Sequence, residues 1–520
     1  MPPRICALSL DNSFTQGVER ADRELLDAQA LVGHLVPAGG MFAFLADHRQ
    51  DLFPDGEFED LFPSGKGRPS IPASVMASIL VLQTLHDLSD RETAEAARCD
   101  LRWKVSTGMA LDHKGFDPST LVYWRKRLTK SDRPHRINEA VRQVVLESGI
   151  LRGRGKRAVD STILAGGSAA ITAVCTAHDY SLAGKPLIDW DEPGAKDALV
   201  SALVNDANAL LGALGEGDLD EAREPVVAAL AMLALVAGQD VEPADGSDGT
   251  DGRWRIARRD GYRAHVAAEP GTGIITGEEL TKAAGPQNSD AAVAEQFLAA
   301  DIIDTADSDD AAGGKDTDDS DHSDHSDAAG TREWYGDSAY GAGDLRKAID
   351  DAGGAAVIKP KPLVSPVEGG FTIDGFTVDE QAGTVGCPAG HTRPISATRV
   401  ASFGALCRDC PLRQQCTKSK SGRKIVLHER DRELRKARSD WTTDPELRDR
   451  YRKFRPNVER VISQIASRGG RRLNLRYRGT VKNHAWLTRR SAGLNLRNLI
   501  GRGLTHTAGV WAAVWLCRLR

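Results

Sequence analysis

The chain has 520 residues, of which 41% are hydrophobic, and its formal net charge is −5. This length is enough for two to four domains with sizeable cores. A run of about eighteen apolar residues does not occur, so no transmembrane helix is predicted. The opening stretch MPPRICALSLDNSF is too polar for a secretory signal, and we expect a cytoplasmic protein.

The small net charge hides a strong asymmetry along the chain. From Cys387 to Arg520 there are 31 Lys and Arg residues against 9 Asp and Glu, a net charge of +22, which leaves −27 for the remaining 386 residues. Such a basic segment indicates a polyanionic partner, most often nucleic acid. The alternative is a solvated charged surface without a partner.

Residues 1–150 are predicted to be helical. Apolar residues recur at helical spacing in SIPASVMASILVLQTLHDL, and Ser89 begins a capping box with Glu92. A further helix begins at Asp117-Pro118 and ends in the basic residues Arg125, Lys126 and Arg127. A basic last helix suits a helix-turn-helix-like contact with DNA. A plain helical bundle is the alternative.

The next segment, residues 155–362, mixes predicted strands and helices. KRAVDSTIL at 156–164 is β-branched and reads as a strand, and helices are expected at 196–214 and 221–236. A hairpin is expected to turn at residues 270–273. Eleven Asp residues between 301 and 328 predict a disordered acidic loop, since this composition cannot form a core. Its DHSDHSD repeat is interpreted as a solvated linker rather than a loose metal site.

Regular secondary structure is expected again from residue 331. The stretch 331–353 reads as a strand, a tight turn and a helix, and AAVIKP at 355–360 reads as another strand. Gly-punctuated residues in 363–386 predict small β-hairpins. Basic helices are expected from 441 to 520. In the last of these, between Arg468 and Arg502, leucines are expected to face inward and arginines outward.

Three acids stand out by their context. Asp160 lies in the predicted strand RAVDSTIL, Asp337 follows a predicted strand in WYGDSAYG, and Glu459 is the one acid in the basic stretch RYRKFRPNVERVISQI. Two strand-borne carboxylates and one helix-borne carboxylate can hold two Mg²⁺ ions, which prefer oxygen ligands. Each strand-borne acid also has a structural alternative. Asp160 could accept a hydrogen bond from the N–H of Ser161 or Thr162, and Asp337 could form an Asx-turn. For Glu459 the alternative is a salt bridge to the neighbouring arginines.

Four cysteines cluster within thirty residues, with the spacing C-x19-C-x2-C-x5-C. They are Cys387, Cys407, Cys410 and Cys416. Four thiolates can close a structural, tetrahedral Zn²⁺ site and order a small β-rich segment at 363–440. The alternative is a set of reduced thiols, and His391 is a competing ligand.

Several of these stretches resemble one protein family. VDSTIL, DGYRAHVA, GDSAYGAGDLR, the cysteine run and YRKFRPNVERVISQIASRGGRRLNLRYRGTVKNHAWLTRRSAGLNLRNL are similar to bacterial insertion-sequence transposases of the DDE type, of the branch numbered eleven-eighty-two. The resemblance implies an α/β (α+β) fold with an RNase H-like core and a helical N-terminal domain. It implies Mg²⁺- or Mn²⁺-dependent DNA cleavage and strand transfer, with Asp160, Asp337 and Glu459 as the catalytic acids.

The resemblance also implies partners and DNA contacts. Tyr451 and Arg455 accompany Glu459 at spacings of four, and Pro456 predicts that a helix starts or kinks there, with Arg455 just outside it. The other expected DNA-binding residues are Arg460, Arg468, Lys482, Arg125, Lys126 and Arg127. Transposon ends and target DNA are the expected partners of a homodimer or larger assembly on the nucleoid. Two alternatives stay open: a decayed transposase that only binds DNA, and a zinc-containing DNA-binding regulator.

Overall fold

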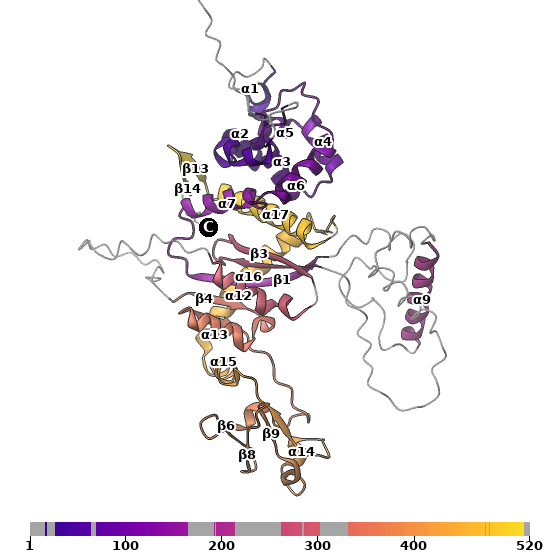
Figure 1. Ribbon diagram of the computed structural model, residues 1–520, viewed down its shortest axis with the longest axis vertical. Coiled ribbons are helices and arrows are strands. Elements are labelled where there is room, and N and C mark those ends of the chain that lie inside the picture. The colour runs from indigo at the N-terminus through magenta and orange to yellow at the C-terminus, as the bar shows by residue number, and fades with distance from the viewer. Residues whose placement is uncertain are drawn as a thin grey trace, which may run out of the picture.

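The computed structural model describes residues 16–17, 26–63, 69–164, 192, 194–213, 262–282, 285–301, 331–473, 475–477 and 479–513. N-terminal helices lie at one end of an elongated molecule, a mixed sheet lies in the middle, and a small β-rich insert lies at the other end (Figure 1). The helix expected at 221–236 and all of the expected acidic loop after Asp301 lie outside the described residues. None of the described helices is long and apolar enough to cross a membrane.

Helices make up the N-terminal region, as predicted. They are α1 (Ala28–Val32), η1 (Gly33–Leu35), α2 (Met41–Leu52), η2 (Asp55–Leu61), α3 (Ala73–His86), α4 (Asp90–Cys99), α5 (Leu101–Thr107), α6 (Ser119–Lys130) and α7 (Arg136–Glu147). Helix α3 is buried along almost its whole length. The predicted capping box is confirmed: Ser89 Oγ accepts a hydrogen bond from the Glu92 N–H, and the Glu92 carboxylate accepts one from the Ser89 N–H.

A five-stranded sheet forms the centre, in the order β3-β2-β1-β4-β5. Its strands are β1 (Lys156–Leu164), β2 (Tyr262–Ala268), β3 (Ile275–Lys282), β4 (Glu333–Gly336) and β5 (Ala355–Ile358). Strands β1, β2 and β3 pair antiparallel, whereas β1, β4 and β5 pair parallel. The predicted strand at 156–164, the hairpin and the two later strands are therefore confirmed. The helix expected at 196–214 is α9 (Ala195–Ala213).

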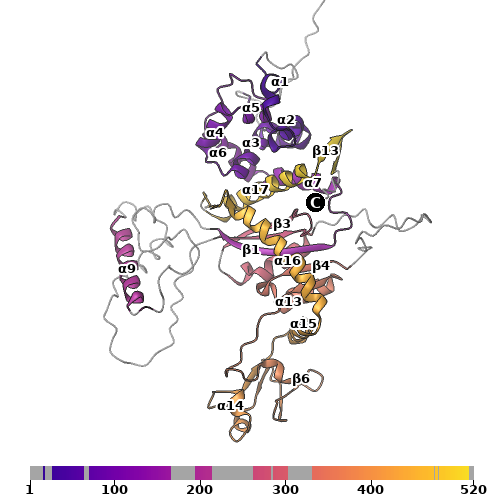
Figure 2. The ribbon, with the colours of Figure 1, turned by 180° about the vertical axis from the view of Figure 1, so that it is seen from behind.

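Helices cover both faces of the sheet. One face packs against α16 (Pro445–Ala466) and α17 (Thr480–Gly501), and the other against α12 (Asp290–Ala299) and α13 (Gly343–Asp351). Figure 2 shows α16 lying across the strands. Ala158 belongs to the core under α16 and Val159 to the opposite core. Because successive strand residues point to opposite faces, Asp160 is on the α16 face.

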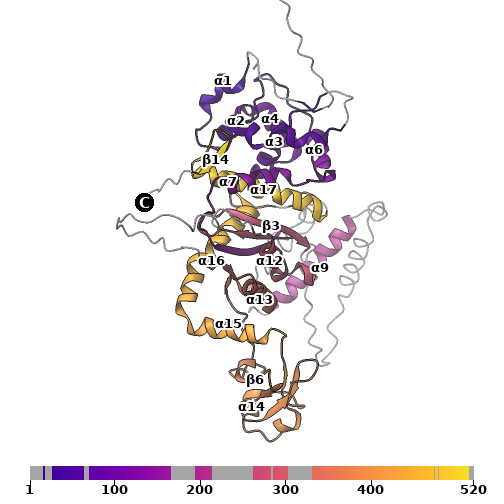
Figure 3. The ribbon, with the colours of Figure 1, turned by 60° about the vertical axis from the view of Figure 1, so that its left-hand side comes forward.

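The insert forms a small unit with its own core. Its elements are η6 (Ile373–Gly375), β6 (Thr377–Asp379), β7 (Thr384–Gly386), β8 (Thr392–Pro394), β9 (Val400–Ser402), η7 (Gly404–Cys407), α14 (Arg413–Cys416) and β10 (Lys424–Val426). Strands β6, β7 and β8 form one antiparallel sheet, and β9 pairs with β10. Phe376, Phe403 and Ile425 are buried in this core. Helix α15 (Asp431–Thr443) leads from the insert to α16 (Figure 3).

The C-terminal region corrects one expectation about arginines. It contains β11 (Ser467–Arg468), β12 (Arg471–Arg472), α17, β13 (Leu504–Thr507) and β14 (Val510–Ala513). Arg489 and Arg490 of α17 were expected to face outward, but both are buried, which lowers their pKa to about 10. The Arg490 guanidinium donates to four carbonyl groups near the ends of α3 and α16, those of Thr84, Gln464, Ile465 and Ser467. Carbonyls at helix ends lack intrahelical donors, and this arginine satisfies them.

Candidate active site

Three elements bring the predicted acids to one place. Asp160 lies on β1, Asp337 directly follows β4, and Glu459 lies on α16. The parallel register pairs Ala158 with Tyr335. Asp160 and Asp337 each come two residues later, so they lie side by side on the face that α16 covers.

The guanidinium of Arg455 lies between the three carboxylates. Its Nη2 is 3.2 Å from Asp160 Oδ1 and 3.7 Å from Asp337 Oδ2, and its Nη1 donates to Glu459 Oε1 at 3.3 Å. The Arg455 side chain is only 6% exposed, whereas that of Glu459 is 65% exposed. The carboxylate oxygens are not all within 4.8 Å of one another, and the guanidinium contacts each of the three. One buried cation therefore holds the cluster together.

Backbone groups orient the two strand-borne acids. Asp160 Oδ1 accepts a hydrogen bond from the Ser161 N–H at 2.8 Å, and Asp337 Oδ1 accepts one from the Ala339 N–H at 2.8 Å. These are the structural contacts that the sequence offered as alternatives. They coexist with the convergence on Arg455, and they fix the direction of each carboxylate.

The electrostatics of the cluster follow from its burial. Burial raises the pKa of Asp160, Arg455 opposes that rise, and Asp337 and Glu459 add to it. Burial also raises the pKa of Tyr451, which lies one helical turn before Arg455 and feels the same charges. The Tyr451 phenol therefore stays protonated at neutral pH and is available as a hydrogen-bond donor.

The expectation that a helix starts at Pro456, with Arg455 just outside it, is wrong. Helix α16 continues from Pro445 to Ala466, with Pro456 inside it and Arg455 within the helix rather than outside. Proline removes one helical hydrogen bond. The following turns nevertheless stay helical, because Val458 and two further apolar residues, Val461 and Ile465, are buried against the sheet. A continuous helix puts Arg455 and Glu459 on the same side. Of these two side chains, that of Arg455 is the buried one.

Five of the six other expected DNA-binding residues have exposed side chains: Lys126, Arg127, Arg460, Arg468 and Lys482. Arg125 instead forms a two-point ion pair with Asp90, at 2.8 and 2.5 Å, and lies over the Tyr477 ring. Arg127 is exposed and lies over the Phe62 ring at 4.6 Å. The structure thus gives Arg125 a role in joining α6 to α4.

The four clustered cysteines surround a single cavity in the insert. Cys387, Cys407, Cys410 and Cys416 line it together with His391. Its volume is about 20 Å³, room for roughly one water-sized particle. Cys407 Sγ accepts a hydrogen bond from the Arg423 N–H at 3.4 Å, as a thiolate ligand does. Burial raises the pKa of the Cys416 thiol, and the other three cysteines add to the rise. This donor set fits a Zn²⁺ ion, and the four cysteine sulfurs would move closer together to bind it.

Sequence reasoning missed two features. It treated Arg455 as a phosphate contact and did not place it among the acids. It also missed a group formed by His48 and Asp51 of α2 with His506 of β13, the one set of three potential metal ligands in the described part of the chain whose ligand atoms all lie within 4.8 Å of one another. Because His506 is so far from His48 and Asp51 in the sequence, no short spacing between the three residues indicates the group.

Two segments of the chain match known protein families. Residues 34–127 match the model described as a transposase domain (DUF772), and residues 386–500 match the model described as a transposase DDE domain. Glu459 lies inside the second match, while Asp160 and Asp337 lie outside both. No curated protein and no solved structure matches the chain.

Proposed function

We propose that this chain, which belongs to the DDE transposases of bacterial insertion sequences, cuts DNA at the ends of its element and joins the freed 3′ ends to target DNA. One observation carries the proposal: Asp160, Asp337 and Glu459 all contact the guanidinium of Arg455. Acids brought together from two strands and one helix, around one cation, suit metal-dependent phosphodiester chemistry.

The topology supports an RNase H-like catalytic core. Three antiparallel strands are followed by two parallel ones, in the order β3-β2-β1-β4-β5, with helices on both faces. Asp160 lies on the central strand, and Asp337 ends its parallel neighbour. Both of these acids thus come from inner strands of the sheet.

The residues present fit divalent ions. The Arg455 guanidinium acts as a stand-in cation, since it contacts an oxygen of each acid within 4.0 Å. Two bound Mg²⁺ or Mn²⁺ ions would supply activation of the attacking oxygen and stabilisation of the leaving oxygen. Asp160 and Asp337 would hold them from the sheet, and Glu459, with its exposed side chain, would turn toward them from α16. Arg455, displaced from the acids, would then pair with a DNA phosphate.

The wider surface supports DNA as the partner. Arg460, Lys482 and the other exposed basic side chains would contact phosphates without reading the base sequence. Tyr451 would donate its phenol proton to a phosphate beside the acids. The cysteine cavity would hold a structural Zn²⁺ ion that orders the insert. Because two DNA ends must be joined, a homodimer or larger assembly is the proposed active form.

Cleavage of DNA that carries the element's own ends tests this function. The wild type should cleave with Mg²⁺, Glu459→Gln should not, and Glu446→Gln, an exposed glutamate in the first turn of the same helix, should cleave normally. Equal cleavage by wild type and Glu459→Gln would refute the role of Glu459. Binding without cleavage by the wild type would favour a decayed enzyme or a DNA-binding regulator.

A further inference from the structure

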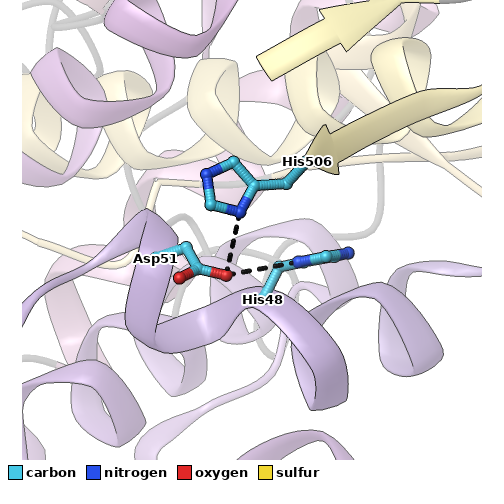
Figure 4. A group of neighbouring side chains, drawn as sticks. All are labelled: His48, Asp51 and His506. Atoms are coloured by element: carbon cyan, nitrogen blue, oxygen red, sulfur yellow. Dashed lines mark hydrogen bonds and ion pairs between the residues drawn. The ribbon is translucent and has the colours of Figure 1, made fainter. Parts of the chain in front are cut away.

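His48, Asp51 and His506 converge (Figure 4) on α2 and β13, which are not the elements that carry the acid cluster. His48 and Asp51 are three residues apart on α2 and therefore share one face of that helix. His506 comes from β13, the first strand of the C-terminal hairpin. Asp51 Oδ2 lies 3.3 Å from His48 Nδ1 and 3.2 Å from His506 Nδ1. Two imidazoles thus approach the same carboxylate oxygen.

We propose that these three side chains form a binding site for a divalent transition-metal ion, with Zn²⁺ as the best fit. Zinc bonds to imidazole nitrogen and carboxylate oxygen are about 2.0–2.2 Å long. Neighbouring ligand atoms in a tetrahedron of that size are about 3.3–3.6 Å apart. The two nitrogen–oxygen separations at Asp51 are close to this value, and all three ligand atoms lie within 4.8 Å of one another, so the side chains already approach the arrangement that an ion needs.

The surroundings hold the two rings in place. The His506 ring packs on Trp511 with centroids 4.3 Å apart, and the His48 ring packs on Trp511 at 5.6 Å and on Phe44 at 5.0 Å. The His48 and His506 rings also meet edge to face at 5.8 Å. Because packing already restricts both rings, binding an ion costs little additional side-chain entropy.

The donor set selects the class of ion. Two imidazole nitrogens and one carboxylate oxygen suit Zn²⁺, Co²⁺ or Ni²⁺ better than Mg²⁺, which prefers oxygen ligands. The Asp51 side chain is 42% exposed, so water can fill a fourth position. This site is chemically distinct from the cysteine-lined cavity of the insert and from the carboxylate cluster.

A bound ion would join two distant parts of the chain. It would attach the hairpin β13–β14 to α2. The same hairpin already contacts the residue after α7, because the Ala513 N–H donates to the Ser148 carbonyl. The hairpin follows α17 directly, and α17 packs on α3 and on the sheet. The ion would therefore stabilise the contact between the N-terminal helices and the end of the catalytic region. This inference does not depend on the proposed DNA chemistry.

Binding of Zn²⁺ and Co²⁺ alone to the full chain tests the site. His48→Gln and His506→Gln should each weaken Zn²⁺ binding here by more than about 100-fold, and each should bind one ion fewer per chain at low Zn²⁺. Asp51→Asn keeps the side-chain shape and should weaken binding in the same direction. The control His34→Gln replaces an exposed histidine and should bind as the wild type does.

The optical spectrum separates this site from the cysteines. Co²⁺ bound here should give visible bands without sulfur-to-cobalt charge transfer, and His506→Gln should remove only those bands. In the wild type, Zn²⁺ should also slow hydrogen exchange in residues 504–513, and His48→Gln should lose that effect. Unchanged Zn²⁺ stoichiometry and unchanged hairpin exchange in both histidine variants would overturn the proposal.

Discussion

Replacing Arg455 with glutamine tests how much the positive charge of Arg455 stabilises the acid cluster. The change removes a buried positive charge and leaves three carboxylates facing one another. Without metal, we therefore expect the variant to be less stable than the wild type. With Mg²⁺, an ion can take the place of the guanidinium, and the difference should shrink.

The size of the effect follows from the exposure of each contact. Removing one partner of a buried ion pair costs about 3–5 kcal/mol, whereas an exposed pair contributes about 0–1 kcal/mol. The Asp337 and Glu459 side chains are 44% and 65% exposed, so their contacts with Arg455 fall in the weaker class. Asp160 is 13% exposed and keeps its hydrogen bond from the Ser161 N–H. We expect a total loss of about 2–4 kcal/mol.

Urea unfolding at pH 7, with EDTA or with Mg²⁺, measures this loss. Saturating Mg²⁺ at 100 times its Kd should return about 2.7 kcal/mol. Arg460→Gln, which removes an exposed charge from the same helix, is the matched control and should change stability by less than about 0.5 kcal/mol. If Arg455→Gln were as stable as Arg460→Gln in EDTA, the proposed electrostatic role of Arg455 would be refuted.

Three further predictions concern Asp160, the cysteine cavity and two basic residues. Burial raises the pKa of Asp160 above its usual 3.8. Without metal, the ionised form of Asp160 therefore destabilises the folded protein. The wild type should lose stability relative to Asp160→Asn as pH rises from about 4 through the raised pKa. Paired urea titrations across that range measure this, and parallel curves would contradict it. Cys410→Ser should lose one Zn²⁺ per chain and expose residues 371–427 to rapid hydrogen exchange while the sheet stays protected; unchanged zinc content would count against the cysteine site. Lys482→Ala should reduce the salt slope of DNA binding by about one, whereas Arg125→Ala should lower stability because it breaks the ion pair with Asp90. Filter binding across a salt series, with thermal melting, separates the two, and equal slopes for Lys482→Ala and wild type would exclude a phosphate contact at Lys482.

Local patterns in the sequence were sufficient to predict many elements. The capping box at Ser89 and the strand at 156–164 depend on neighbouring residues, and the structure confirms both. The β2–β3 hairpin was found in the same way, because Gly271 and Gly273 mark its turn. Such features need no knowledge of distant contacts.

Distant contacts explain what the sequence did not predict. Pro456 argued for a helix start, yet packing of α16 against the sheet keeps the helix continuous. Arg490 looked like a surface residue, yet carbonyl groups from two other helices surround it. The position of Arg455 among the acids likewise depends on three separate elements meeting. Each of these outcomes requires the tertiary fold.

The most direct test of the central claim is single-turnover DNA cleavage by Asp337→Cys. The Asp337 side chain is 44% exposed, so a thiol fits there without disturbing the core. A thiolate binds Mg²⁺ poorly but accepts the softer Mn²⁺ more readily. We predict that this variant is inactive with Mg²⁺ and regains cleavage with Mn²⁺. Full activity with Mg²⁺ would contradict a metal-binding role for Asp337, and so would the absence of rescue while wild type cleaves with both ions.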